Sequence, residues 1–351
     1  MYRIDIDTAD YVGQKTHEKP AFAKLNVSLI YLFLLMFSTP GLANQPVQTV
    51  DRDIPTSLQT PPVTSGSNFT THIGVANLNG ESNEYVYDYS GNTVSELNWK
   101  LENLLMLNMG ISIKAISDIK LNADLWIKIN DGSGSMDDYD YSLISLGYEG
   151  WTDWSHSDNV PVDKAYMIDI NAEIPIAVQD TSVLSAIIGY KRDNWRWKAY
   201  GGNYIYSTNS IHDSVGSSPA NQLGITYEQW WNVPYVGLGF NSTTSKFTLR
   251  GRVIGSVIVQ AFDEDHHHLR DLIYEEEFTN GNMYAADIAV DYQATKNMLI
   301  SGSLHYQKYD TVKGTTTITD LSNGQISYYS GDVAGADNTA TMLSFNLVYG
   351  F

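Results

Sequence analysis

The 351-residue chain contains no cysteine, which excludes disulfide cross-links, thiolate metal sites and a cysteine nucleophile. Charged residues are scarce, at 17%, and acidic ones dominate: 40 Asp and Glu stand against 21 Lys and Arg, for a formal net charge of −19. This excess of acid disfavours nucleic acid as a partner and favours cationic ligands or substrates. Beyond residue 43, no apolar run is long enough for a transmembrane helix.

One apolar run occurs near the start of the chain. Lys24 precedes the apolar residues 25–37, and the small residues Gly41 and Ala43 follow. This order is typical of a secretory signal peptide and its cleavage site. We therefore expect a targeting segment over 1–43, a flexible lead-in rich in Thr, Pro and Ser over 44–66, and the mature domain over 67–351.

Alternation of apolar and other residues is abundant. Over residues 119–130, Ile, Leu and Ala recur at every second position, a period of two that is long for a soluble strand but suits a tilted membrane strand. The same alternation runs from Leu343 to the terminal Phe351, as in outer-membrane barrels. An edge strand of a soluble β domain is the alternative. The pattern favours an all-β fold, a transmembrane antiparallel β-barrel.

About ten alternating runs are present, an even number as single-chain bacterial barrels require. They lie near residues 68–89, 95–115, 118–140, 162–178, 181–206, 222–241, 246–265, 283–294, 298–312 and 339–351. The longer connections all fall at one end, which predicts long extracellular loops there and tight turns at the other end. A diffusion porin is disfavoured, because side chains largely fill a lumen of this width.

Two acidic clusters are predicted to share the extracellular rim, because the third and seventh strands both run outward. Asp138 and Asp140 end the third strand, and Asp263, Asp265 and His267 end the seventh. A carboxylate beside an imidazole orients its tautomer and raises its basicity, which suits a general base. A solvated polar loop is the competing interpretation. Simple alternation points Asp138 and Asp140 into the lumen but places His267 outside, unless a β-bulge intervenes or the strand continues above the bilayer.

Seven short motifs follow one another along the chain. They are Asn83-Glu84-Tyr85-Val86-Tyr87, Ser95-Glu96-Leu97-Asn98-Trp99-Lys100, Ser135-Met136-Asp137-Asp138-Tyr139-Asp140, Gly150-Trp151-Thr152-Asp153, Gly201-Gly202-Asn203-Tyr204-Ile205-Tyr206, Pro234-Tyr235-Val236-Gly237-Leu238 and Asp263-Glu264-Asp265-His266-His267. Each is weak alone, but the ordered set resembles the omptins, ten-stranded outer-membrane proteases of Gram-negative bacteria. The resemblance covers the chain from about residue 68 to its end.

The resemblance implies an endopeptidase of the bacterial outer membrane whose active site faces the extracellular side. By position, Asp265 and His267 match a dyad in which the histidine activates a water. Asp138 and Asp140 match the opposing carboxylates. Neither a metal nor another cofactor is implied. A catalytically inactive barrel that acts as an adhesin is the alternative.

Glu84 and Asp263 match the family positions that line the primary pocket, which takes the basic side chain before the cut. Two carboxylates can grip a guanidinium bidentately, which favours Arg over Lys. The partners implied are cationic peptides and proteins cleaved at basic or dibasic sites, and the chain is expected to act as a monomer.

The sequence departs from the family pattern at its histidines. His266 lies inside the Asp-x-His triplet and His268 follows it, so His266 is the alternative to His267 as the base. A metal site at these histidines is disfavoured, because adjacent residues diverge on a strand. His156 lies one place earlier than a family histidine, which leaves its role open.

Lipopolysaccharide, which supports omptin activity, is the remaining partner that the resemblance implies. The positions that would bind it look like Asn194 and Trp230, which carry no charge. The nearby cations that are candidates to replace them are Lys191, Arg192, Arg196 and Lys198. The lipid is therefore a candidate activator, and these two positions leave open whether activity depends on it.

Two further groups of residues have no catalytic interpretation. Residues 275–277, three consecutive glutamates, are predicted to form a charged loop or strand rim. Four tryptophans are expected to be anchors at the membrane interface: Trp195, Trp197, Trp230 and Trp231.

Overall fold

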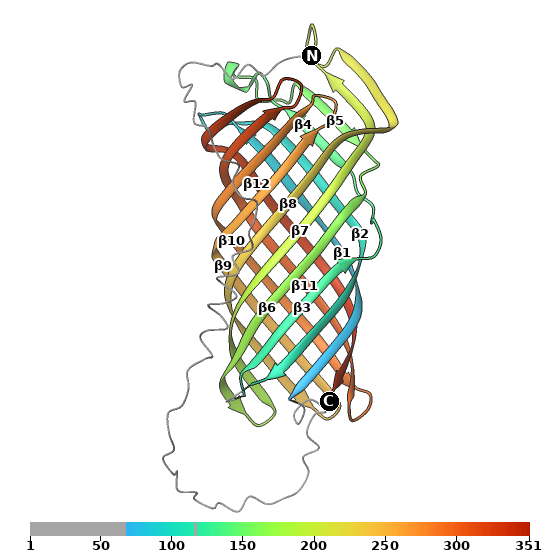
Figure 1. Ribbon diagram of the computed structural model, residues 1–351, viewed down its shortest axis with the longest axis vertical. Coiled ribbons are helices and arrows are strands. Elements are labelled where there is room, and N and C mark those ends of the chain that lie inside the picture. The colour runs from blue at the N-terminus through green and yellow to red at the C-terminus, as the bar shows by residue number, and fades with distance from the viewer. Residues whose placement is uncertain (1–67, 116–117) are drawn as a thin grey trace, which may run out of the picture. The chain divides into compact units, whose positions relative to one another are not determined.

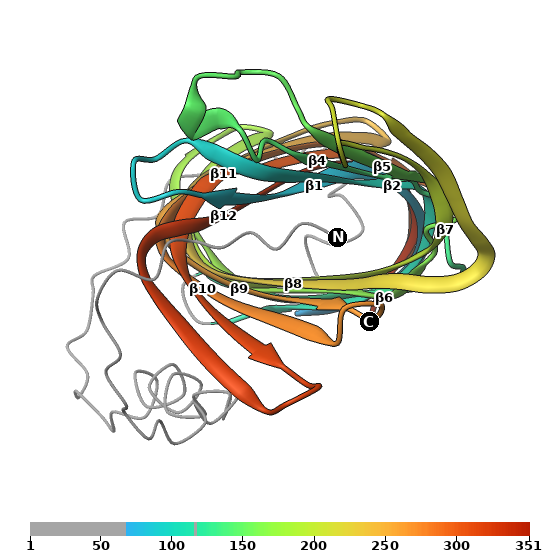
Figure 2. The same ribbon diagram turned by 90° about the horizontal axis from the view of Figure 1, so that it is seen from above.

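Long antiparallel strands close into a barrel in the computed structural model, which describes residues 68–115 and 118–351 (Figure 1). The strands are β1 (Phe69–Tyr87), β2 (Thr93–Lys114), β3 (Lys120–Lys128), β4 (Met136–Asp140), β5 (Asp153–Ser157), β6 (Val162–Gln179), β7 (Ser182–Tyr206), β8 (Ser214–Thr244), β9 (Phe247–His267), β10 (Leu272–Gln293), β11 (Met298–Asp320) and β12 (Gln325–Gly350). The ring closes because β1 pairs with both β2 and β12. The closed ring of strands is seen along the barrel axis in Figure 2. The targeting segment and lead-in expected before residue 67 lie outside the described residues.

Two positions in the ring are each shared by two consecutive strands. β3 and β4 pair with different parts of β2, and β5 and β6 pair with different parts of β7. The 12 strands therefore occupy ten positions, which confirms the predicted all-β barrel of about ten strands. Among the described residues, no helix is long and apolar enough to cross a membrane.

The connections at the upper end in Figure 1 are shorter than the sequence suggested. The loops expected near 207–221, 263–282 and 312–339 are mostly strand, because β8 starts at Ser214, β10 at Leu272 and β12 at Gln325. Hydrophobic alternation missed these extensions because neither face of a strand above the membrane meets lipid. One longer irregular connection remains over 141–152, with the 3-10 turn η2 (Ile144–Leu146).

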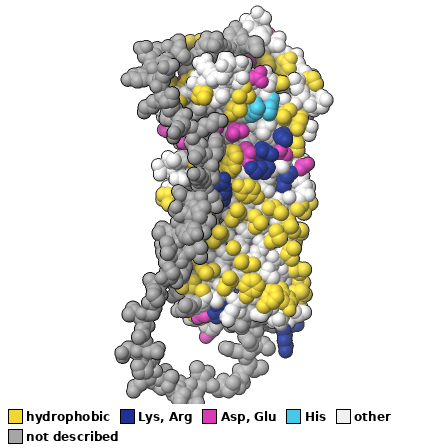
Figure 3. Space-filling model, in the orientation of Figure 1, with side chains coloured by type: hydrophobic (Ala, Val, Ile, Leu, Met, Phe, Trp, Pro, Cys, Tyr) yellow, Lys and Arg dark blue, Asp and Glu magenta, His cyan; other side chains and the backbone are white. Residues whose placement is uncertain are grey.

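The outer surface divides into an apolar band and a charged girdle above it (Figure 3). Large apolar side chains exposed in the band include Ile188, Val253, Val257, Ile288, Leu304 and Phe345. Charged side chains facing lipid are costly, so the membrane-spanning segments end below the charged residues of the girdle, which include Lys164, Arg196, Glu228 and Glu264. Asp263 and Asp265 flank Glu264, so the strand ends that carry them lie outside the membrane.

Aromatic side chains fill the barrel beneath its upper mouth. Trp99 and Trp197 both lie against Tyr227, with ring centroids 5.2 Å and 6.0 Å away. Trp195, Trp197 and Trp231 are buried, so the prediction that they are interface anchors was wrong. Trp195 and Trp197 alternate with the outward-facing Asn194, Arg196 and Lys198, and Trp231 lies between Trp230 and Asn232, so the period of two points these three rings into the barrel.

Paired charges fill the lumen below this aromatic layer. Lys191 contacts Asp193 at 3.0 Å, and Arg252 contacts Asp169 at 2.9 Å. Buried charges are tolerated when each has a partner. The filled lumen disfavours a diffusion porin, as the strand count predicted, and gives the mouth a floor.

Candidate active site

A β-bulge in β9 sets the direction of the Asp-x-His segment. Asn232 pairs with Gln260 and Val236 with Gly255, so β9 has one residue more than β8 over this stretch. Val257 and Ile258 are both exposed, whereas Val259 is buried. The extra residue reverses the alternation, and Asp263, Asp265 and His267 therefore point into the mouth.

Asp138 and Asp140 face the same mouth from the opposite wall. Their cross-strand partners on β2 are Leu97 and Ser95, both of which are buried. Asp137 lies between Met136 and Asp138 in sequence. Its side chain points outward and accepts a hydrogen bond from Trp154 Nε1 at 3.1 Å. The inward direction predicted from the alternation of the third strand is confirmed.

His267 and Asp265 form a close pair. The distance from His267 Nε2 to Asp265 Oδ2 is 2.6 Å, and the side chains are 15% and 2% exposed. With Nε2 donating to the carboxylate, the neutral imidazole keeps Nδ1 as its basic nitrogen. Tyr274 packs beside the imidazole, with ring centroids 5.3 Å apart. This geometry suits a base that takes a proton from water.

Glu84 and Asp263 lie deeper in the mouth and are both buried. Tyr227 donates a hydrogen bond to Asp263 Oδ2 at 2.9 Å, and Gln229 donates to Tyr227 Oη at 2.6 Å. The Tyr227 hydroxyl, held by Gln229, therefore links Asp263 to the aromatic layer below it. The structure brings together all six residues that the sequence singled out.

Glu276 is a further acidic residue of this cluster. It pairs with Asp263 across β9 and β10, and its side chain is buried. The prediction of a charged loop or rim was therefore wrong at this residue. The sequence-based prediction missed Glu276 because it did not extend this strand back to Leu272. In the extended strand, a period of two places Glu276 on the inner face together with Phe278 and leaves Glu277 exposed.

Burial and mutual repulsion dominate the electrostatics of the mouth. Burial raises the pKa of Asp138, and Asp140 raises it further. Burial likewise raises the pKa of Asp140. Burial, with Asp265 and Glu276 nearby, raises the pKa of Glu84. Close carboxylates cannot all ionise at neutral pH, so the cluster holds protons in this range.

Five carboxylate oxygens in the mouth are buried and have no hydrogen-bond partner among the described residues. They belong to Glu84, Asp138, Asp263, Asp265 and Glu276. Buried polar groups without a partner are rare because they cost free energy. Oxygens of this kind, gathered at one opening, suit a ligand that brings positive charge and hydrogen-bond donors.

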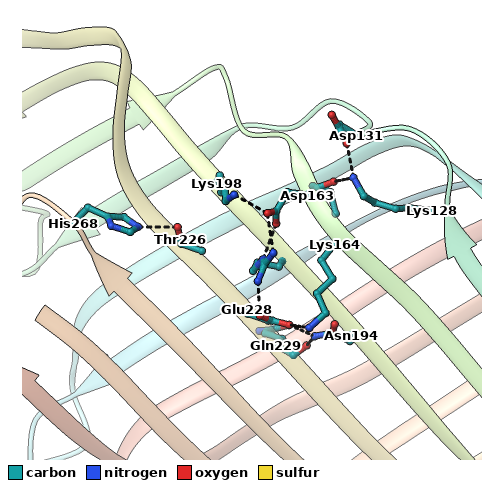
Figure 4. Close-up of polar contacts among 12 residues, drawn as sticks. Lys128, Asp131, Asp163, Lys164, Asn194, Lys198, Thr226, Glu228, Gln229 and His268 are labelled. Atoms are coloured by element: carbon teal, nitrogen blue, oxygen red, sulfur yellow. Dashed lines mark hydrogen bonds and ion pairs between the residues drawn. The ribbon is translucent and has the colours of Figure 1, made fainter.

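The other histidines lie away from the mouth. His266 and His268 stack with ring centroids 3.8 Å apart, and His268 Nε2 lies 2.8 Å from Thr226 Oγ1 (Figure 4). His156 lies 2.8 Å from both Asp137 and Asp158. In the described part of the chain, no three or more His, Asp and Glu residues are arranged to hold a metal ion.

Ion pairs cover the outer wall formed by β6, β7 and β8 (Figure 4). Arg196 grips Asp163 with two hydrogen bonds of 2.8 Å and 2.9 Å. Lys198 also contacts Asp163, at 2.8 Å, and Lys164 contacts Glu228 at 2.6 Å. Lys164, Arg196 and Lys198 are therefore already paired with carboxylates of the same chain, whereas Arg192 donates to Tyr166 and Asn232 instead.

The two uncharged wall positions also have partners. Asn194 is buried and donates to Glu228 Oε1 at 2.8 Å. The Lys164 ammonium lies 5.7 Å from the ring centre of Trp230. Lys191 points into the barrel, as its pairing with Asp193 shows, so it does not belong to this wall.

The barrel and the acidic mouth define a membrane-embedded hydrolase of the outer-membrane type. The sequence profile of the omptin family matches residues 65–351, and the chain belongs to that family. It is 31% identical to a plasminogen activator from Yersinia pestis over 84% of this chain and 93% of the relative. It is 27% identical to the outer membrane protease OmpP from Escherichia coli over 80% of this chain and 90% of the relative.

The fold agrees with a solved member of the family. The crystal structure of the outer membrane protease OmpT from Escherichia coli superposes with a TM-score of 0.78 and 26% identity, over 82% of this chain and 98% of that chain. The chain is thus an outer-membrane protease that acts on peptide or protein substrates.

Proposed function

We propose that this protease is an endopeptidase that cleaves next to basic residues, with water activated by His267 and Asp265 opposite Asp138 and Asp140. The observation that carries the proposal is the 2.6 Å contact between His267 and Asp265 at a mouth lined by buried carboxylates. No serine, threonine or metal is needed to supply the nucleophile.

In the proposed mechanism, His267 Nδ1 removes a proton from water while the water oxygen attacks the scissile carbonyl carbon. Asp265 holds the imidazole and stabilises the imidazolium that forms. Because burial raises the pKa of Asp138, a protonated carboxyl of the Asp138 and Asp140 pair is available to donate to the developing oxyanion. The imidazolium then gives its proton to the leaving amine as the C–N bond breaks.

The specificity proposal rests on the charge of the inner mouth. Glu84 and Asp263 each have a buried oxygen without a partner, and a guanidinium can satisfy both with fixed N–H donors. The net charge of −19 would draw cationic peptides towards the mouth.

Peptide cleavage tests this function directly. The refolded full chain is given quenched peptides that differ only in carrying Arg-Arg, Arg-Lys or Gln-Gln at the centre. We expect cleavage of the basic peptides that survives EDTA and serine- or cysteine-directed inhibitors. A folded barrel that binds these peptides but never cuts them would instead support an adhesin.

Glu84→Gln tests the specificity part of the proposal. We expect kcat/KM for the Arg peptide to fall by about 10- to 100-fold, because a charge-assisted hydrogen bond to the guanidinium is lost. Glu96→Gln, on the outer face of β2, is the matched control and should leave the rate unchanged. Equal rates in the two variants would contradict the pocket assignment.

The site is proposed to face the extracellular side. It lies at the end of the barrel above the apolar band, opposite the end where Phe351 lies 5.4 Å from Phe69 between ring centroids. Short turns join the strands at that opposite end, as is usual on the periplasmic side.

Lipopolysaccharide is proposed to contact the outer wall without being required for activity. Its phosphates would have to compete with Asp163 and Glu228 for Arg196 and Lys164, which are already paired. These ion pairs would hold β6, β7 and β8 together in the absence of an anionic lipid.

Refolding in neutral detergent, with and without lipopolysaccharide, tests this proposal. We expect less than about threefold stimulation of the intact protein, and larger stimulation of Glu228→Gln, because that substitution frees Lys164 for phosphate while Arg196 stays bound to Asp163. Glu275→Gln, an outward carboxylate on β10, serves as the control. Activity of the intact protein that appears only with lipopolysaccharide would overturn the proposal.

A further inference from the structure

We propose that Glu276 is a third specificity residue, which shares one proton with Asp263 and makes recognition of a guanidinium side chain dependent on release of that proton. The inference rests on the proposed cleavage at basic residues and deepens it. It begins from the position of Glu276, directly opposite Asp263 in the pairing of β9 and β10.

Both side chains are enclosed. Glu276 is 3% exposed and Asp263 is 4% exposed, and Glu276 Oε2 and Asp263 Oδ1 have no hydrogen-bond donor among the described residues. The other oxygen of Asp263 is held by Tyr227 at 2.9 Å. The Thr316 hydroxyl lies beside Glu276; otherwise the free oxygens of the two acids are left to each other and to a ligand.

Two carboxyl groups can hydrogen-bond to each other only if one of them carries a proton. Asp263 and Glu276 lie within reach of such a bond. Burial raises the pKa of Asp263 to about 8, and burial together with Asp263 raises the pKa of Glu276. At neutral pH the pair is therefore expected to carry one proton and one negative charge.

Glu84 completes an acidic pocket around this pair. Its Oε2 is also buried without a partner, and burial raises its pKa, followed by the charges of Asp265, Glu276 and Asp263. When a guanidinium binds, the shared proton is released to solvent. The planar N–H donors of the guanidinium then bond to the carboxylate oxygens of Glu84, Asp263 and Glu276. A lysine ammonium has fewer donors and is more strongly hydrated, so it gains less from the third carboxylate.

The test uses the refolded full chain with agmatine and cadaverine, simple amines that carry the arginine and lysine head groups. We expect the inhibition constant for agmatine to fall as pH rises through about 8, since the pair then carries both charges. In Glu276→Gln this pH dependence should flatten, and KM for the Arg peptide should rise about tenfold or more with kcat little changed. The preference for Arg over Lys should shrink.

Glu277→Gln is the matched control, because Glu277 is the next residue of β10 and is exposed. Equal KM values for Glu276→Gln and Glu277→Gln would overturn the inference. If the first variant does not fold, as judged by heat-modifiable gel mobility, a pH-independent inhibition constant in the intact protein overturns it instead. Failure of the intact protein to cleave any basic peptide is a different result, which contradicts the proposed function itself.

Discussion

His267→Ala is expected to lower kcat for a basic peptide by about 10²- to 10⁴-fold, or roughly 3–5 kcal/mol of barrier, with KM little changed. The imidazole is the group positioned to take the proton from water, and Asp265 holds it through a 2.6 Å contact. The substitution removes the base but leaves the carboxylates that would bind the basic side chain. Steady-state kinetics on the refolded protein measures both parameters.

His266→Ala provides the control for this experiment. His266 is adjacent in sequence but lies on the outer face, where its ring stacks with His268. We expect a change of less than about twofold. A larger loss in His266→Ala than in His267→Ala would reverse the assignment of the base. Heat-modifiable gel mobility establishes that each variant has folded.

Asp138→Asn is expected to reduce kcat by about 10²- to 10³-fold, a loss comparable to removal of one oxyanion donor. Burial and Asp140 raise the pKa of Asp138, so this carboxyl keeps its proton above the usual range. In the intact protein, kcat should therefore fall as pH rises through that raised pKa. The amide cannot lose a proton in this range, and the alkaline limb should shift in the variant.

Asp137→Asn is the matched control for Asp138. Asp137 lies one residue earlier but points outward, where it contacts Trp154 and His156. The substitution makes the same charge change on the other face of β4, and we expect kcat to stay within about twofold of the intact protein. An unchanged kcat and pH profile in Asp138→Asn would remove this residue from the proposed mechanism.

The sequence by itself determined the fold class and the chemical composition of the site. A period of two, sustained over 119–130 and over the final strand, is sufficient to indicate a barrel, because the membrane imposes one apolar face on every strand. The order of the strands then brings Asp138 and Asp263 to the same rim. The motif order was sufficient to indicate the family.

The direction of the Asp-x-His segment was decided only by the tertiary structure. Alternation from Val253 upward places His267 on the outer face, and the bulge at Val257 and Ile258 reverses it. Gly255 and the three consecutive apolar residues Val257, Ile258 and Val259 are compatible with a bulge but do not locate the extra residue. It becomes visible only through the register with β8.

The third acid of the pocket was also beyond the reach of the sequence. Hydrophobic alternation disappears above the membrane because neither face of β10 meets lipid there, and 275–277 then reads as a charged run. The pairing of Glu276 with Asp263 separates one buried acid from its exposed neighbour Glu277. The sequence determined which strands cross the membrane, because lipid selects their side chains, whereas cross-strand register alone decided which acids meet inside the mouth.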